Sequence, residues 1–146
     1  MRVRPSALII ERNCVLTMKY RYGGQDVYAL PGGSPDPGET LPEAVVRELR
    51  EELGVETEVG RMVLCGEVPG DGKRADALHV VFAAHLIAGL PELNPEHTSA
   101  RSVEWLAPGD LAEKYLYPNV GKEIAALLAG GGPPGYLGRI DQTFFT

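Results

Sequence analysis

Glu48, Glu51 and Glu52 are the residues of this sequence whose types and spacing are best suited to chemistry. On a helix, successive side chains are 100° apart, so Glu48 and Glu52 lie one turn apart and Glu51 lies beside them. Carboxylate oxygens are the ligands that hard dications such as Mg²⁺ prefer, and Mg²⁺ also binds phosphate oxygens and water. The spacing therefore predicts a metal site for cleaving a phosphoanhydride. The alternative is a charged helix face that is simply solvated.

The charge pattern of this segment has an energetic cost. Glu48–Glu51 and Glu48–Glu52 are like-charge pairs at three and four residues, each unfavourable by roughly 0.2–0.5 kcal/mol. Arg47 offsets part of this cost, because it is an opposite-charge neighbour of Glu43 and Glu51. A bound dication would also compensate the clustered charge, so the surrounding sequence is needed to choose between the two interpretations.

A helix is predicted between Thr40 and Gly54. Thr40 and Glu43 have the spacing of a capping box, and Gly54 is a typical C-terminal stop. The apolar residues that share one arc of this helix, suited to a core, are Val45, Val46, Leu49 and Leu53. The preceding residues 32–39 are rich in Gly and Pro and can expose their backbone to a ligand.

The residues from Gly33 to Val55 resemble the Nudix box of the Nudix hydrolase family. Gly33 is followed after five residues by Glu39, and after seven more by the run R-E-L-R-E-E-L-G-V at residues 47–55. Every constrained position of the box is met. The resemblance implies an α+β fold, an α/β/α sandwich with a mixed β-sheet between helices. It also implies hydrolysis of a nucleoside diphosphate linked to another moiety, with Mg²⁺ or Mn²⁺ as cofactor.

The resemblance also implies roles for individual residues. The expected catalytic set is Arg47, Glu48, Glu51 and Glu52. Glu48 and Glu52 are the expected primary metal ligands, with Glu51 as a further ligand or as the base, and the Gly32 carbonyl as an additional oxygen ligand. Arg47 is expected to orient the glutamates, and the residues expected to be structural are Gly33, Glu39 and Gly54. The general base stays open, and the candidates outside the box are Glu92, Glu96 and Glu104.

Tyr28 and Asn119 are the predicted substrate-binding residues outside the box. Tyr28 is placed to stack on a base, and Tyr117-Pro118-Asn119 resembles the segment in which MutT-type members place an asparagine against the base. The alternatives are packing for Tyr28 and a helix cap for Asn119. Nucleoside triphosphates, including oxidised ones, are expected ahead of ADP-ribose or other nucleotide sugars. A non-catalytic nucleotide-binding module is the alternative from another class, but such modules usually lose acids of the box.

Composition limits the remaining possibilities. A chain of 146 residues with 44% hydrophobic residues predicts one domain with a proper core. The net charge of −6 argues against a nucleic-acid polymer as partner. A small-molecule nucleotide is the expected partner, and a homodimer is a family-level expectation. Cys14 and Cys65 are expected as free thiols, and the N-terminal apolar run is too short for a signal peptide or a membrane span, which predicts a cytoplasmic location.

The rest of the chain predicts the elements around the box. Strands are expected at residues 3–10, 15–20, 27–30, 55–68, 77–88 and 102–106. A helical turn is expected at residues 108–111 and a helix at residues 120–129. The expected domain comprises residues 1–130, and residues 131–146 are expected as a Gly/Pro linker and a C-terminal tail that docks on the domain or on a second subunit.

Overall fold

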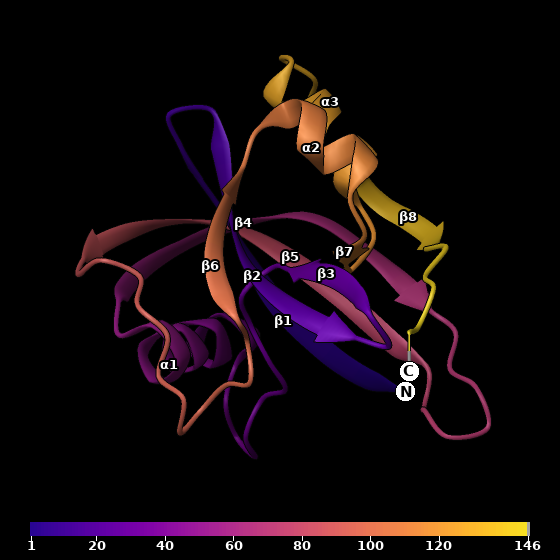
Figure 1. The fold of residues 1–146 in the computed structure, drawn as a ribbon, viewed down its shortest axis with the longest axis horizontal. Coiled ribbons are helices and arrows are strands. Elements are labelled where there is room, and N and C mark those ends of the chain that lie inside the picture. The colour runs from indigo at the N-terminus through magenta and orange to yellow at the C-terminus, as the bar shows by residue number, and fades with distance from the viewer. Residues whose placement is uncertain (146) are drawn as a thin grey trace.

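The structure, a computed structural model, describes residues 1–145 and has the expected α+β architecture, a mixed β-sheet between helices (Figure 1). The strands are β1 (Arg2–Glu11), β2 (Cys14–Tyr22), β3 (Gln25–Ala29), β4 (Glu56–Val68), β5 (Ala77–Ala88), β6 (Ser102–Leu106), β7 (Leu116–Tyr117) and β8 (Gly135–Arg139). The helices are α1 (Leu41–Leu53), α2 (Pro108–Glu113) and α3 (Gly121–Leu128). The predicted strands are confirmed, with ends that differ by one or two residues.

The sheet combines parallel and antiparallel neighbours. Within residues 1–145 it has eight strands, seven of them in the order β7-β3-β2-β1-β5-β4-β8, while β6 pairs with β2. Strand β1 runs parallel to β5, whereas β2 runs antiparallel to β3 and β6. The β1–β2 hairpin turns at Arg12 and Asn13, whose φ angles of 52° and 61° suit a turn that follows the twist of the strands.

Strand β1 lies between two hydrophobic cores, because successive side chains of a strand point to opposite faces. Ile9 packs in the core beneath α1, together with Leu49 and Leu53. Leu8 packs in the other core, which also contains Leu111 of α2 and Ile124 of α3. Figure 1 accordingly shows α1 well apart from the pair α2 and α3.

Helix α1 begins and ends as the sequence predicts. The Thr40 side chain accepts a hydrogen bond from the Glu43 amide at 3.2 Å, and Glu43 Oε1 accepts one from the Thr40 amide at 2.9 Å, which completes the capping box. Gly54 adopts the left-handed conformation with φ 66° and donates its N–H to the Arg50 carbonyl. These local contacts set the length of the helix that carries the acids.

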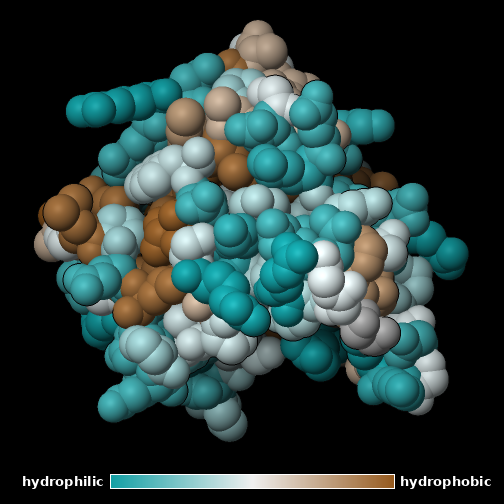
Figure 2. Space-filling model, viewed as in Figure 1, coloured by the Kyte–Doolittle hydropathy of each residue, from teal (hydrophilic) through white to brown (hydrophobic). Residues whose placement is uncertain are grey.

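Figure 2 shows a mostly hydrophilic face on which hydrophobic residues gather toward one side. No helix within the described residues is both long enough and apolar enough to span a lipid bilayer. Cys14 and Cys65 are free, as expected, and each is only partly buried.

The C-terminal segment docks on the domain, which is one of the two expected alternatives, but it does so as a strand of the sheet, which the sequence did not predict. Strand β8 pairs in parallel with β4, from Leu64↔Gly135 to Glu67↔Arg139. Ile140, which follows β8, is 4% exposed and belongs to the core that α2 and α3 cover. The sheet therefore extends past residue 130. Sequence patterning missed β8 because glycine-containing segments carry a weak strand signal.

Candidate active site

The loop between β3 and α1 lies directly against the backbone of β1. The Ala7 amide donates to the Pro31 carbonyl at 2.8 Å, and the Gly33 amide donates to the Pro5 carbonyl at 3.2 Å. A Cβ on Gly32 would lie 2.2 Å from the Pro5 carbonyl oxygen, so only glycine fits at this position. The loop is thereby held at the strand against which α1 also packs.

Arg47 connects this loop to the acids of α1. Its Nε and Nη2 donate to the two carboxylate oxygens of Glu39 at 2.8 and 2.9 Å, and Nη2 also donates to the Ser34 carbonyl at 3.1 Å. Its Nη1 donates to Glu48 Oε1 at 3.0 Å and to Glu51 Oε2 at 3.3 Å. These hydrogen bonds, Glu39 first, raise the pKa of Arg47 and lower that of Glu39. One guanidinium thus limits the positions available to three carboxylates.

Glu48 lies against the backbone of the loop. A Cβ on Gly33 would lie 2.5 Å from Glu48 Cδ, so the carboxylate occupies the space that a side chain would need. The glycine therefore allows the acid and the loop to come together.

Glu52 differs from Glu48 and Glu51 because one of its carboxylate oxygens, Oε2, is buried without a hydrogen-bond partner among residues 1–145. Burial, followed by repulsion from Glu48, raises the pKa of Glu52 to about 7, while Arg4 acts in the opposite direction. An unpaired, buried carboxylate oxygen costs stability unless a cation or a donor joins it.

The donor set fits a hard dication. Glu48 and Glu52 supply carboxylate oxygens from one face of α1, and Glu52 Oε2 is the unpaired atom that a cation would satisfy. In the part of the chain that the structure describes, no three His, Cys, Asp or Glu side chains converge ready-made for a metal. Arg47 instead binds Glu48 Oε1 and Glu51 Oε2. Glu51 is also the more exposed acid, with 38% of its side chain accessible against 18% for Glu48.

A cleft of about 430 Å³ is connected to these acids through two of its lining residues. Arg4 and Tyr20 line it, and both are close enough to Glu52 for the charges to influence one another. Its basic and aromatic lining residues are Arg2, Arg4, Arg74, Tyr20, Tyr22, Tyr117, Phe144 and Phe145. Such a lining suits a ligand that combines a flat ring with negative charge.

Sequence reasoning did not assign Arg4, Tyr20 or the C-terminal aromatic residues to a site. The sequence signal that could have identified Arg4 is a charged residue within a strand, next to apolar residues. The cleft itself joins β1, β2, β3, β7 and the segment after β8, which are far apart in the sequence. No local pattern identifies such an assembly.

The structure does not bring Tyr28 to the acids, which corrects its prediction as a substrate-binding residue. Tyr28 is 7% exposed and belongs to the core beneath α2 and α3. The ammonium of Lys114 lies 5.2 Å from the centre of its ring. Packing, the alternative interpretation, accounts for this side chain.

Asn119 does not line the cleft, although its partner Gln142 does, and its side chain is bound to the protein, which corrects its prediction as a substrate-binding residue too. Its Nδ2 donates to the Asp141 carbonyl at 3.0 Å, and its backbone amide donates to Gln142 Oε1 at 2.8 Å. The residue before α3 is Val120, with no side-chain cap, so the helix-cap alternative is also wrong. Asn119 instead fastens the segment that follows β8.

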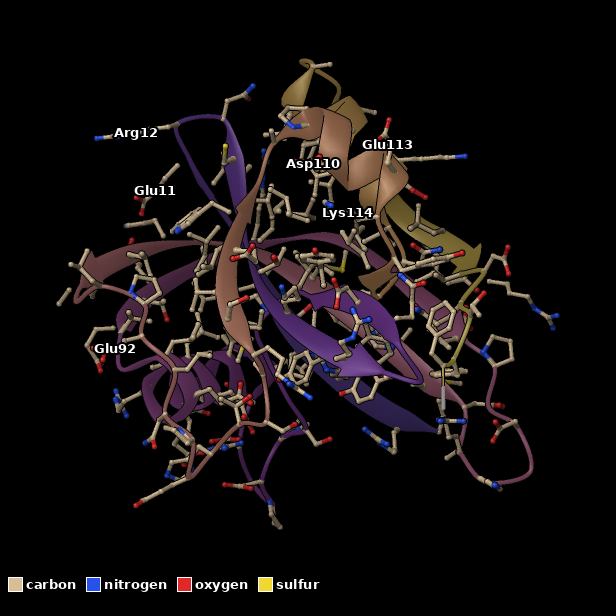
Figure 3. All side chains as sticks on the ribbon, in the orientation of Figure 1. Glu11, Arg12, Glu92, Asp110, Glu113 and Lys114 are labelled. Carbon is tan, nitrogen blue, oxygen red and sulfur yellow. The ribbon has the colours of Figure 1, made fainter. Side chains whose placement is uncertain are left out.

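None of the acids proposed outside the box lines the cleft, although Glu92 lies at the C-terminal end of α1, where its amide donates to the Leu53 carbonyl at 3.0 Å. Glu92 and Glu96 are exposed in the loop between β5 and β6, and Glu104 lies in β6. Figure 3 shows Glu92 at the outer edge of the molecule, and Asp110 and Glu113 on α2, far from α1. Among the box glutamates, Glu52 is the one whose charge acts on both Arg4 and Tyr20 of the cleft.

Comparisons with known proteins bear on the family of this chain. The family model described as NUDIX domain matches residues 2–128. An ADP-ribose pyrophosphatase of Methanocaldococcus jannaschii is 36% identical over 83 residues, which cover 56% of this chain and 49% of the relative. A CTP pyrophosphohydrolase of Escherichia coli is 35% identical over 115 residues, which cover 72% of this chain and 83% of the relative. The chain thus spans about half the length of the archaeal relative and most of the bacterial one.

The fold is shared with solved structures as well. The crystal structure of a MutT NUDIX hydrolase from Burkholderia pseudomallei superimposes with a TM-score of 0.70 at 26% identity, covering 87% of this chain and 96% of that one. The family model, the relatives and the fold agree with the complete box at residues 33–55. The chain therefore belongs to the Nudix hydrolase family.

Proposed function

We propose that this protein is a Mg²⁺-dependent or Mn²⁺-dependent pyrophosphohydrolase that cleaves the phosphoanhydride of a nucleoside diphosphate linked to another moiety. The observation that carries the proposal is the buried, unpaired Oε2 of Glu52, beside Glu48 and connected through Arg4 and Tyr20 to a basic, aromatic cleft. Members of the Nudix family generally use divalent ions, and the oxygen donors of α1 suit such ions.

The residues have distinct parts in the proposed reaction. Glu48 and Glu52 would hold the cation, with Glu51 and the Gly32 carbonyl as further oxygen donors. When bound, the cation supplies Lewis-acid chemistry, which neutralises phosphoryl oxygens and lowers the pKa of water. Arg47 keeps Glu48 and Glu51 in fixed positions relative to the loop, which is what phosphoryl transfer mainly requires of a protein.

We propose nucleoside triphosphates as the substrate class, with ADP-ribose or another nucleotide sugar as the second candidate. The relative named for CTP matches over 83% of its length, whereas the relative named for ADP-ribose matches over 49% of its length. Asn119 no longer supports this order, because it is bound to the C-terminal segment. The aromatic lining of the cleft accommodates the base of either class.

The test is turnover of a panel of compounds with Mg²⁺ and with EDTA. The panel contains the common nucleoside triphosphates, an oxidised guanosine triphosphate, ADP-ribose, nucleotide sugars and dinucleoside polyphosphates. We expect cleavage of at least one compound that requires Mg²⁺ and is lost in Glu52→Gln but kept in Glu113→Gln, a matched change on α2. Absence of all cleavage, with binding of nucleotides retained, would instead identify a non-catalytic nucleotide-binding module.

A further inference from the structure

Arg4 is a buried cation whose hydrogen-bonding capacity is only partly used. Its Nη2 donates to the Leu30 carbonyl at 3.0 Å. Its Nη1 has no partner among the described residues and almost no exposed surface of its own, although Arg4 as a whole stays partly accessible where it lines the cleft. A guanidinium stays protonated and carries five donors. An unpaired buried N–H is therefore a cost that a ligand can remove.

Neighbouring rings hold this guanidinium in place. The Cζ of Arg4 lies 5.0 Å from the centre of the Tyr117 ring, a cation–π contact. Tyr117 is in turn braced edge-on by His79, with ring centres 4.9 Å apart. Burial holds the pKa of His79 down at about 3, so this neighbour is neutral at ordinary pH. Arg4 thus has a fixed orientation, and His79 adds no second positive charge behind Tyr117.

Two acids of the box act on the charge of Arg4. Burial lowers the pKa of Arg4, while Tyr117, Glu52 and then Glu48 favour its charged form. Within residues 1–145, however, no ion pair joins Arg4 to either glutamate. Arg4 and Glu52 therefore carry opposite charges that act on each other. Each side chain has one buried atom without a hydrogen-bond partner in the described part of the chain, Nη1 of Arg4 and Oε2 of Glu52. An anion on Arg4 together with a cation on Glu52 would satisfy both.

We propose that Arg4 is a substrate-binding residue whose Nη1 donates to a non-bridging oxygen of the substrate's phosphate chain. The inference deepens the proposed function, on which it rests for the identity of the site. A phosphate oxygen is the preferred partner, because guanidinium and phosphate form strong charge-assisted hydrogen bonds. Five of the other lining residues are aromatic and suit the base, while Arg2 and Arg74 are further cations at the cleft.

The test separates the phosphate from the rest of the ligand. Calorimetric titrations compare CMP with cytidine and AMP with adenosine in Mg²⁺, because the monophosphates contain no anhydride to cleave. Arg4→Met, which keeps the length of the side chain, should weaken monophosphate binding roughly tenfold to a hundredfold. Nucleoside binding should stay within about twofold, because the base contacts remain. Arg61→Met is the matched control, since Arg61 is an exposed arginine of β4 that does not line the cleft.

Several results would overturn the assignment. Equal weakening of nucleoside and monophosphate would mean that Arg4 only supports the fold through the Leu30 carbonyl. If Arg4→Met does not fold, the same titrations are made with Arg4→Lys. Lysine keeps the positive charge but cannot donate to the Leu30 carbonyl and to the phosphate at the same time. Monophosphate binding by Arg4→Lys equal to that of the wild type would also overturn it. Turnover in the panel assay is independent of these titrations, so failure of the proposed function is seen separately.

Discussion

The carboxylate of Glu48 occupies the space that a side chain at Gly33 would need. A Cβ at that position would lie 2.5 Å from Glu48 Cδ and 2.6 Å from its Oε1. Gly33→Ala must therefore displace the acid or the loop. Displacement of about 1 Å at a reacting centre costs on the order of a hundredfold in rate, so we expect kcat to fall by at least tenfold.

Gly109→Ala in α2 is the matched control for this change, because a Cβ there meets nothing within 4 Å. Steady-state kinetics and thermal unfolding of both variants provide the measurement. Wild-type kcat in Gly33→Ala would show that the position of Glu48 is not critical.

Arg47→Lys should lower kcat by about tenfold or more with a smaller change in KM. The guanidinium reaches Glu39, Glu48 and Ser34 at once, and a lysine ammonium cannot reproduce the planar fork. Arg50→Lys on the same helix is the control, because Arg50 also binds a carboxylate through two donors, at 2.8 Å each to Glu56, but on the exposed surface. Similar kinetics for the two variants would contradict an orienting role for Arg47.

The raised pKa of Glu52 predicts a pH dependence of stability in the metal-free protein. Its pKa is about 7 in the folded state against an ordinary value of 4.5. Between these values the unfolded state loses its proton first, so ionisation progressively favours unfolding as pH rises, and the full cost is present above pH 7. Glu52→Gln removes this cost. In EDTA, its Tm relative to the wild type should therefore rise by roughly 3–6 °C between pH 4.5 and pH 8, after discounting for the solvent contact of Glu52.

The difference in Tm between variant and wild type is the quantity to follow, since it cancels the titration of other groups. Glu113→Gln, an exposed change on α2, should show no such trend. A difference that is constant with pH would mean that Glu52 titrates normally in the fold.

Mg²⁺ should reverse this order of stability at pH 8. A ligand that binds only the folded state stabilises it by mass action, by about 2.7 kcal/mol at a concentration of 100 Kd. Wild-type Tm should rise with Mg²⁺ concentration, and the rise should be small in Glu48→Gln and Glu52→Gln. An equal rise in Glu48→Gln, Glu52→Gln and the wild type would place the bound cation elsewhere.

Ile140→Ala tests whether the segment around β8 is part of the folded body. Ile140 is 4% exposed, and its side chain lies against Gly66 of β4, where a Cβ would come within 2.8 Å. The truncation should lower the free energy of unfolding by roughly 2–4 kcal/mol in urea. Leu90→Ala, at a residue that is 87% exposed, should change it by less than about 0.5 kcal/mol. Equal stability of the two variants would show that the segment contributes nothing to the core.

The sequence by itself determined the helix of the box, its ends and the acids that it carries. Thr40, Glu43 and Gly54 act on backbone groups within a few residues of themselves, so local spacing was enough to predict them. The strands up to residue 106 were likewise readable, because their apolar patterns follow the pleat. The family followed from the spacing of the box, which the family model and the relatives confirm.

Only the tertiary structure decided what surrounds those acids. Arg4 of β1 contacts the ring of Tyr117 in β7. Asn119 forms hydrogen bonds with Asp141 and Gln142, and β8 pairs with β4 at the edge of the sheet. Each of these contacts joins residues that are far apart in the sequence, so no periodic pattern of the sequence predicts it. Their positions depend on strand order and on the packing of two cores against one sheet, and these are properties of the assembled chain rather than of any local segment.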